Sequence, residues 1–187
     1  SSQALTVTGD LTLAAASTAT HEGLAGDHSF GSVTIGSGAS FGATSGTTTI
    51  DSRDGSNQSW IEVGTFTHNS GTVAFTSSES ENIIKANDGF YDVTFATGTY
   101  KIQAYTGTTV TVYDGMSVNS GTVKFYNNAH NLTVHGNTLV AGTFNEAAHS
   151  GVLTFNGLVT NSGTFYTSSG TNNFNGGVRN LGTFTSN

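Results

Sequence analysis

The chain has 187 residues, with 5 basic and 12 acidic side chains and a formal net charge of −7. This acidic balance argues against nucleic acid or an anionic membrane as the main partner. No apolar run approaches the ~18 residues that would insert into a bilayer as a helix. The sequence contains no Cys and no Pro, but 25 Gly, 12 Phe and 6 Tyr. Because Pro is excluded from the middle of sheets and this mixture favours strands and tight turns, we predict one all-β domain over residues 1–187.

The N-terminal third has the alternation of strands but a less regular repeat, in which the Gly-Thr marker appears at Gly46. The segments Leu5–Leu13 and Phe30–Gly42 alternate apolar and polar residues and are punctuated by Gly. Between them, residues 14–27 are rich in small side chains, which predicts a lateral loop or a short helix. The stretch 51–57 is polar and predicts a loop. Its last residue, Asn57, begins a triplet that matches the N-glycosylation pattern and is a candidate acceptor.

The rest of the chain repeats with a period near 20 residues, so we divide the domain into less regular rungs over 1–63 and regular rungs over 64–187. A Gly-Thr pair recurs with Gly at 98, 121, 142, 163 and 182, so the spacings are 23, 21, 21 and 19. The larger interval of 27 residues from Gly71 to Gly98 predicts a longer loop in that rung. Several short strands per period are typical of a solenoid. We therefore predict a parallel β-helix with roughly 20 residues per rung and about nine rungs.

Stacked rungs would align like residues into ladders along the rod. The predicted core ladders are Tyr100, Val123, Phe144, Phe165 and Phe184, and Tyr113, Val134, Phe155 and Phe174. A corner ladder is predicted from Asn69, Asn119, Asn161 and Asn180. Asn tolerates left-handed backbone and can bond to the Asn of the next rung, and a neighbouring Gly would supply the positive φ of a sharp corner.

The phrases "GTFTHNSGTVAF", "GFYDVTF" and "NLTVHGN", and the run that continues to Phe184, resemble the repeats of large exported prokaryotic surface proteins. These are adhesin-like and autotransporter-passenger-like β-helices. The resemblance implies an extracellular or cell-surface, right-handed parallel β-helix with a structural or adhesive role. This chain departs from the family in its short length and in lacking secretion and anchoring segments.

The final residues, 180–187, continue the repeat without a capping helix, a Pro or an acidic residue. Since soluble solenoids cover their open sheet edges, the chain is either a slice of a longer protein or stacks on another subunit. The segment Ala4–Leu13 would be a natural partner for that end. Our leading hypothesis is a structural subunit that polymerises head to tail. The alternative is an adhesin segment that binds glycans or surfaces while staying dispersed.

Catalysis is the weaker interpretation. The carboxylates Asp51, Asp54, Glu62, Asp88, Asp92 and Asp114 could include an acid/base pair of the kind that β-helical polysaccharide enzymes use. Arg53 could neutralise a sugar acid next to Asp54, and Trp60 could stack on the sugar ring. The sequence favours the plainer alternative, a polar loop with a Trp packed on the barrel. We predict no enzyme and assign no catalytic residues.

We also predict no metal site and no cofactor. Six His residues (21, 28, 68, 130, 135 and 149) are present, and His130 and His149 could lie on adjacent rungs, but no tight ligand spacing supports zinc. Asp and Asn at turns would suit calcium, but the calcium-binding nonapeptide is absent and no residues can be assigned. Thr clusters at 47–49 and 108–111 suggest an ice-binding surface. Such a surface requires Thr-x-Thr on the same face of every rung, and the rungs do not keep this pattern.

Overall fold

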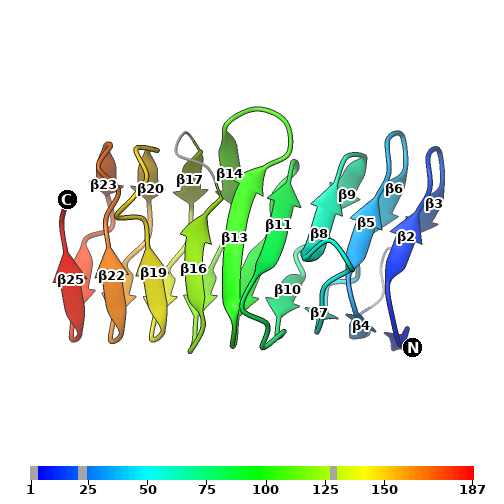
Figure 1. Cartoon of the computed structure of the whole chain (residues 1–187), viewed down its shortest axis with the longest axis horizontal. Coiled ribbons are helices and arrows are strands. Elements are labelled where there is room, and N and C mark those ends of the chain that lie inside the picture. The colour runs from blue at the N-terminus through cyan, green and yellow to red at the C-terminus, as the bar shows by residue number, and fades with distance from the viewer. Residues whose placement is uncertain (1–3, 21–24, 127–129) are drawn as a thin grey trace.

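The protein is described by a computed structural model over residues 4–20, 25–126 and 130–187. Within these residues every helix or strand is a β-strand, and the strand pairs are parallel (Figure 1). The strands stack into a β-solenoid of about 8 turns, with successive turns roughly 22 residues apart. The predicted parallel β-helix is confirmed, with turns slightly longer and fewer than expected. The chain begins at one end of the rod and finishes at the other (Figure 1).

Sheet A runs the whole length of the solenoid, and each turn contributes one strand to it. Each strand pairs with the strands of the turns before and after it. Its strands are β1 (Leu5–Thr6), β4 (His28–Phe30), β7 (Thr47–Ile50), β10 (Thr72–Phe75), β12 (Asp92–Phe95), β15 (Met116–Val118), β18 (Thr138–Val140), β21 (Val159–Asn161) and β24 (Val178–Asn180).

Sheet B is the second continuous face and lies towards the viewer in Figure 1. The chain enters it after each strand of sheet A. Its strands are β2 (Leu11–Leu13), β5 (Val33–Ile35), β8 (Gln58–Glu62), β11 (Asn82–Ala86), β13 (Thr99–Ala104), β16 (Thr122–Phe125), β19 (Thr143–Asn145), β22 (Thr164–Tyr166) and β25 (Thr183–Thr185).

The third face is divided into two sheets. Sheet C contains β3 (Thr18–Thr20), β6 (Ser40–Gly42) and β9 (Thr65–Thr67), and sheet D contains β14 (Thr109–Val112), β17 (Asn131–Val134), β20 (Leu153–Phe155) and β23 (Asn172–Phe174). In the turn between β9 and β14, the described chain makes only an isolated bridge on this face, from Phe90 to Val112.

The small-residue segment 14–27 is not a helix where it is described. Thr18–Thr20 forms strand β3 and pairs with β6, so the Thr-Ala-Thr triplet follows its strand propensity. The prediction of a short helix is wrong for these residues. Residues 21–24 of the segment, including His21, lie outside the described part of the chain.

Alternation along each strand builds a narrow core of aromatic and aliphatic side chains. In β10, Val73 and Phe75 are buried at 2 % and 0 % exposure, while the residues between and before them face outwards. Rings of successive turns stack directly: Phe165 lies between Phe144, at 4.8 Å between centroids, and Phe184, at 5.2 Å. Such offset ring pairs add to the apolar burial that stabilises each turn on the next.

The structure aligns Tyr100, Val123, Phe144, Phe165 and Phe184 in one inward-facing ladder of sheet B. In sheet D it aligns Val134, Phe155 and Phe174 in another ladder. The residue before Val134 in this ladder is Val112, which is 1 % exposed. The prediction that Tyr113 occupies this core position is wrong, because Tyr113 is 48 % exposed. A shift of one residue along a strand moves a side chain to the opposite face.

The Gly-Thr marker does not always occupy the same corner. From Thr99 onwards, the Thr of each marker begins a strand of sheet B, whereas Gly71 is followed by Thr72 at the start of a strand of sheet A. The interval of 27 residues from Gly71 to Gly98 therefore spans more than one turn. It also contains the loop 76–81, so the predicted extra loop is present.

Candidate functional site

The two ends of the solenoid carry strands that have a neighbour on one side only. Among the described strands, these are β1, β2 and β3 at one end and β23, β24 and β25 at the other (Figure 1). Apolar side chains are exposed there: Val178 is 40 % exposed, Leu181 65 % and Leu5 38 %. Phe174 and Phe184 are only partly buried against the core. A strand edge of this kind offers a row of backbone N–H and C=O groups for further pairing.

The last two turns are joined by an Asn pair at the corner between sheets A and B. Asn161 and Asn180 are in register on adjacent strands of sheet A. Asn161 is fully buried, and its Nδ2 donates to Asn180 Oδ1 at 2.7 Å and to the carbonyl oxygen of Thr183 at 2.8 Å. This part of the predicted corner ladder therefore bridges two rungs and the start of β25.

The predicted ladder does not extend to the other two Asn residues. In the two preceding turns, the residues in register with Asn161 are Val140 and Val118. Asn119 is the next residue after Val118 and is exposed, so it is not part of this ladder. Asn69 lies at another corner, before β10, with a φ of 45°, and donates to the carbonyl oxygen of Ala43 at 2.7 Å. The four-residue ladder is thus wrong, because Asn suits several kinds of corner.

A hollow of about 330 Å³ opens on sheet B. It is lined by Lys101, Lys124, Phe125, Tyr126, Asn145, Ala148 and His149. Lys101 and Lys124 are in register on adjacent strands. The Lys101 Nζ lies 5.6 Å from the centre of the Tyr126 ring, a cation–π distance, and Lys101 also pairs with Glu81.

A buried carboxyl group contacts the imidazole that borders this hollow. Glu146 is 0 % exposed, and its Oε2 lies 3.0 Å from His149 Nδ1. Burial raises the pKa of Glu146 to about 7, and the interaction with His149 partly opposes that shift. The His149 ring packs edge-on against Phe125 at 6.1 Å. The carboxyl group and the ring are therefore in close contact, but these buried atoms do not form a well-aligned hydrogen bond.

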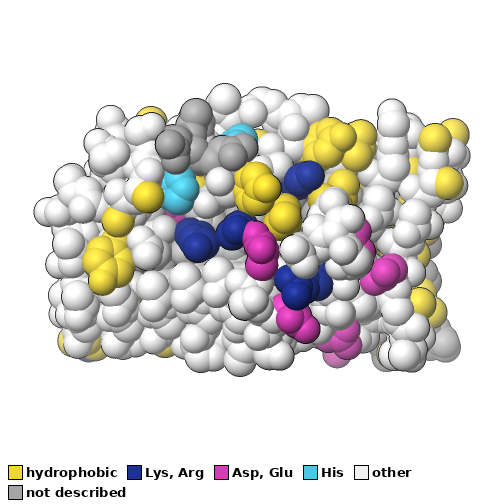
Figure 2. All heavy atoms as spheres, in the orientation of Figure 1, with side chains coloured by type: hydrophobic (Ala, Val, Ile, Leu, Met, Phe, Trp, Pro, Cys, Tyr) yellow, Lys and Arg dark blue, Asp and Glu magenta, His cyan; other side chains and the backbone are white. Residues whose placement is uncertain are grey.

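Charged side chains gather over the middle of this face (Figure 2). The loops 51–57 and 76–81 meet there: Arg53 Nη2 lies 3.1 Å from Glu79 Oε2, and Arg53 Nη1 donates to the carbonyl oxygen of Glu81 at 2.6 Å. Asp54 instead stabilises its own turn, because its Oδ1 accepts from the amides of Ser56 and Gln58, both at 2.8 Å. Arg53 and Asp54 thus have structural partners in this loop.

Trp60 does not offer a sugar-stacking surface, contrary to the catalytic interpretation. It is fully buried, with ring centroids 4.8 Å from Phe66 and 5.5 Å from Phe90. Its Nε1 donates to Glu62 Oε2 at 3.3 Å. The plain alternative, a Trp packed into the solenoid, is the observed arrangement.

Two acidic side chains replace the missing strand of the third face, a feature that the sequence did not reveal. Glu62 is 0 % exposed, and its Oε1 accepts from the amide of Asp88 at 2.5 Å. Asp88 Oδ2 in turn accepts from the amide of Phe66 at 2.9 Å. Burial raises the pKa of Glu62 to about 7, against the lowering effect of these amide hydrogen bonds. The pair satisfies backbone donors that a strand would otherwise satisfy.

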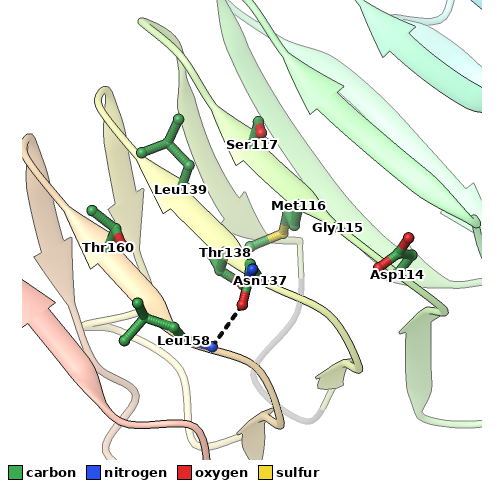
Figure 3. A pocket seen from close by; sticks show the side chains of 9 residues that line it. All are labelled: Asp114, Gly115, Met116, Ser117, Asn137, Thr138, Leu139, Leu158 and Thr160. Atoms are coloured by element: carbon green, nitrogen blue, oxygen red, sulfur yellow. Dashed lines mark hydrogen bonds between the residues drawn. The ribbon is translucent and has the colours of Figure 1, made fainter.

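A second groove, of about 440 Å³, crosses β15, β18 and β21 on sheet A (Figure 3). Asn137 holds its wall, because its Oδ1 accepts from the amide of Leu158 at 3.0 Å. Leu139 and Leu158 are 41 % and 40 % exposed. Asp114 is the ionisable side chain among the lining residues.

Of the other carboxylates considered above, Asp92 accepts from the amide of Gly115 at 2.7 Å, which again is a structural contact.

Tyr113 belongs to an outer stack on the edge of the third face. Its ring centre lies 5.2 Å from that of His68 and 6.3 Å from that of His135. Burial, and to a smaller extent the charge of His149, lower the pKa of His130. Among the described residues, no three His, Cys, Asp or Glu side chains are placed to hold a metal ion.

Asn57, the candidate glycosylation site, lies at the end of loop 51–57, half-buried with a φ of 65°. The sequence offers little support for the Thr lattice of an ice-binding surface, and among the described strands of sheet B from β13 to β25 only one Thr ladder forms. Thr99, Thr122, Thr143, Thr164 and Thr183 form one ladder on sheet B. The next outward ladder begins with Lys101 and Lys124 and continues as Asn145, Tyr166 and Thr185. The two-ladder Thr lattice that ice binding requires is therefore not formed there.

No family model matches the chain, and neither a curated protein nor a solved structure matches it. A search for bilayer-crossing helices in the described residues found none.

Proposed function

We propose that this protein is a structural subunit of an extracellular or cell-surface assembly and that it polymerises head to tail through the ends of its solenoid. The observation that carries the proposal is the continuity of sheets A and B, each with nine parallel strands in the described chain. At each end of the solenoid, the outermost strand of each of these sheets has one unpaired edge. A contact between such edges is heterologous and does not close, so it propagates into a filament.

The side chains at the ends support this proposal. Edge strands that must stay monomeric usually carry charges or Pro, yet β24 and β25 contain one charged residue, Arg179. The ring of Phe184 stacks on Phe165 and remains partly buried, so a further rung could cover it. The extracellular location is part of the proposal and rests on the resemblance of the repeats to exported surface proteins.

The test is to image the purified chain by negative-stain electron microscopy and to follow its light scattering with concentration. We expect rods whose lengths exceed one subunit. The variant Val178→Lys/Leu181→Lys places two charges on the exposed end and should stay monomeric. Leu139→Lys is the matched control, because Leu139 is 41 % exposed but lies on β18, which is paired on both sides within sheet A. Wild-type protein that stays dispersed at high concentration, or rods unaffected by the double substitution, would refute the proposal.

The proposal includes no catalytic activity. Several of the carboxylates that suggested catalysis bond to backbone amides within the fold, as described for Asp54, Glu62, Asp88 and Asp92. A test for polysaccharide cleavage, with Asp54→Asn as the comparison, should give no activity for either protein.

A further inference from the structure

Two positively charged side chains mark one end of a polar surface on sheet B. Lys101 and Lys124 stand side by side on β13 and β16 and line the hollow together with Tyr126. Glu81 pairs with Lys101 from the side of loop 76–81. Lys124 forms no such ion pair with a described residue, although its charge also acts on the Glu81 and Glu146 carboxyl groups. The chain has 12 acidic residues and 5 basic ones, so paired lysines at a hollow are unusual on this protein.

Beyond these lysines, sheet B continues towards β25 as a strip of uncharged polar side chains. Thr143, Thr164 and Thr183 form one ladder of this strip. Asn145, Tyr166 and Thr185 form the ladder beside it. The strands β19, β22 and β25 contain no Asp, Glu, Lys or Arg. The strip thus offers hydroxyl and amide groups and one phenol ring, in register, over three rungs.

We propose that this surface binds a glycan, with an acidic sugar in the hollow and neutral sugars along the strip. The Lys124 ammonium would meet the anionic group, with the His149 imidazole beside it in the hollow. Asn145 and the Tyr166 ring suit the hydroxyl-rich remainder, because amides bond to sugar hydroxyls and rings pack against sugar faces.

The distribution of charge distinguishes a glycan from a nucleic acid. A nucleic acid carries a phosphate at each nucleotide, and its binding depends on several Lys or Arg contacts along the backbone. Here the positive charges occupy one end and the rest of the strip is uncharged. A polymer with one anionic unit followed by neutral units fits that pattern. The inference concerns the side of the rod and does not depend on end-to-end assembly.

The proposal can be tested by calorimetric titration of the full chain with four probes: lactose carrying one sialic acid, lactose carrying one sulfate, plain lactose and inorganic sulfate. We expect one or both anionic lactose derivatives to bind at least about tenfold more tightly than lactose and inorganic sulfate. Binding of the sialylated form alone identifies a carboxylate as the anionic group, and binding of the sulfated form alone identifies a sulfate. Equal affinity for plain lactose, or inorganic sulfate binding as well as the anionic sugars, would overturn the proposal.

Two pairs of variants check the location. Lys124→Gln should weaken binding of the acidic sugar about tenfold, whereas Lys85→Gln should leave it unchanged, since Lys85 is on sheet B but does not line the hollow. Tyr166→Ser should weaken binding of a longer glycan with the same acidic end, and Tyr113→Ser, which alters the outer stack, should not. Retained affinity in Lys124→Gln would refute the site. Affinity should be the same in Val178→Lys/Leu181→Lys, which separates this result from the assembly test.

Discussion

At the scale of single residues, the corner glycines are needed for close approach between turns. A Cβ added at Gly163 would lie 2.0 Å from the carbonyl oxygen of Gly142 and 2.4 Å from that of Ala141. Gly163 does not have a positive φ, so the conformational reason that we expected from the sequence is not the one that applies here. Gly98 does have it, at 79°. At Gly163, therefore, Gly is required because the backbone of the preceding turn lies too close to leave room for a side chain.

Gly163→Ala should lower the free energy of unfolding by ~2 kcal/mol, since an added methyl in a filled space forces the backbones apart. Gly55→Ala is the matched control, because nothing lies within 4 Å of its added Cβ, and it should change stability by less than ~0.5 kcal/mol. Urea unfolding followed by circular dichroism measures both. If both substitutions change the free energy of unfolding equally, the effect comes from backbone entropy and not from contact of the added methyl with the preceding turn.

Glu62 makes stability depend on pH. Its pKa is raised from 4.5 to about 7 in the folded chain, chiefly by burial. Between these values the folded protein keeps a proton that the unfolded chain has released. Stability should therefore fall as pH rises from about 4.5 to 7, by ~3 kcal/mol for this group, and then level off.

In Glu62→Gln this contribution should disappear, so the fall in unfolding free energy over the same pH range should be smaller than in the wild type. Glu146 shifts in the same direction and should account for part of the slope that remains. Denaturation at several pH values provides the comparison. A slope identical to that of the wild type would show that Glu62 does not hold the extra proton.

At the scale of elements, two continuous sheets carry the solenoid past a gap in the third. Between β9 and β14, the Glu62 and Asp88 carboxyl groups bond to backbone amides of this region, while β11 pairs fully with β13 on sheet B. Strand pairing on two faces is thus enough to keep consecutive turns in register. The last turn has another device, because Asn161 ties β21 to Asn180 and to the start of β25.

Asn161→Ala should loosen the last turn selectively. The substitution removes the hydrogen bonds to Asn180 and to the Thr183 carbonyl oxygen, each worth about 0.5–1.5 kcal/mol because both partners are exposed to water. Because a solenoid couples mainly neighbouring turns, amide hydrogen exchange should speed up in β24 and β25 and stay unchanged in β10 and β12. Uniform acceleration along the chain would instead indicate global unfolding and contradict local coupling.

At the scale of the whole molecule, the rod is a one-dimensional stack whose stability is a sum over turns and the contacts between them. If the ends associate as proposed, the folded state is stabilised by mass action, and the melting temperature should rise with protein concentration. We expect no such rise in Val178→Lys/Leu181→Lys. A melting temperature independent of concentration in the wild type would argue against end-to-end association.

The sequence by itself determined the period and the fold class. A repeat of Gly-Thr and aromatic residues near 20 positions can bury its apolar face only by stacking, so the parallel β-helix and the Tyr100-to-Phe184 ladder follow from residues alone. The hollow on sheet B did not follow, because its lining comes from three different turns whose register no single turn specifies.

Only the tertiary structure decided which residue of β14 enters the core and which corner each marker occupies. Val112 and not Tyr113 enters the core, and Asn69 and Asn161 lie at different corners. The physical reason is the two-residue period of a strand: a slip of one position reverses every side chain, and contacts with the neighbouring turns decide between the two settings.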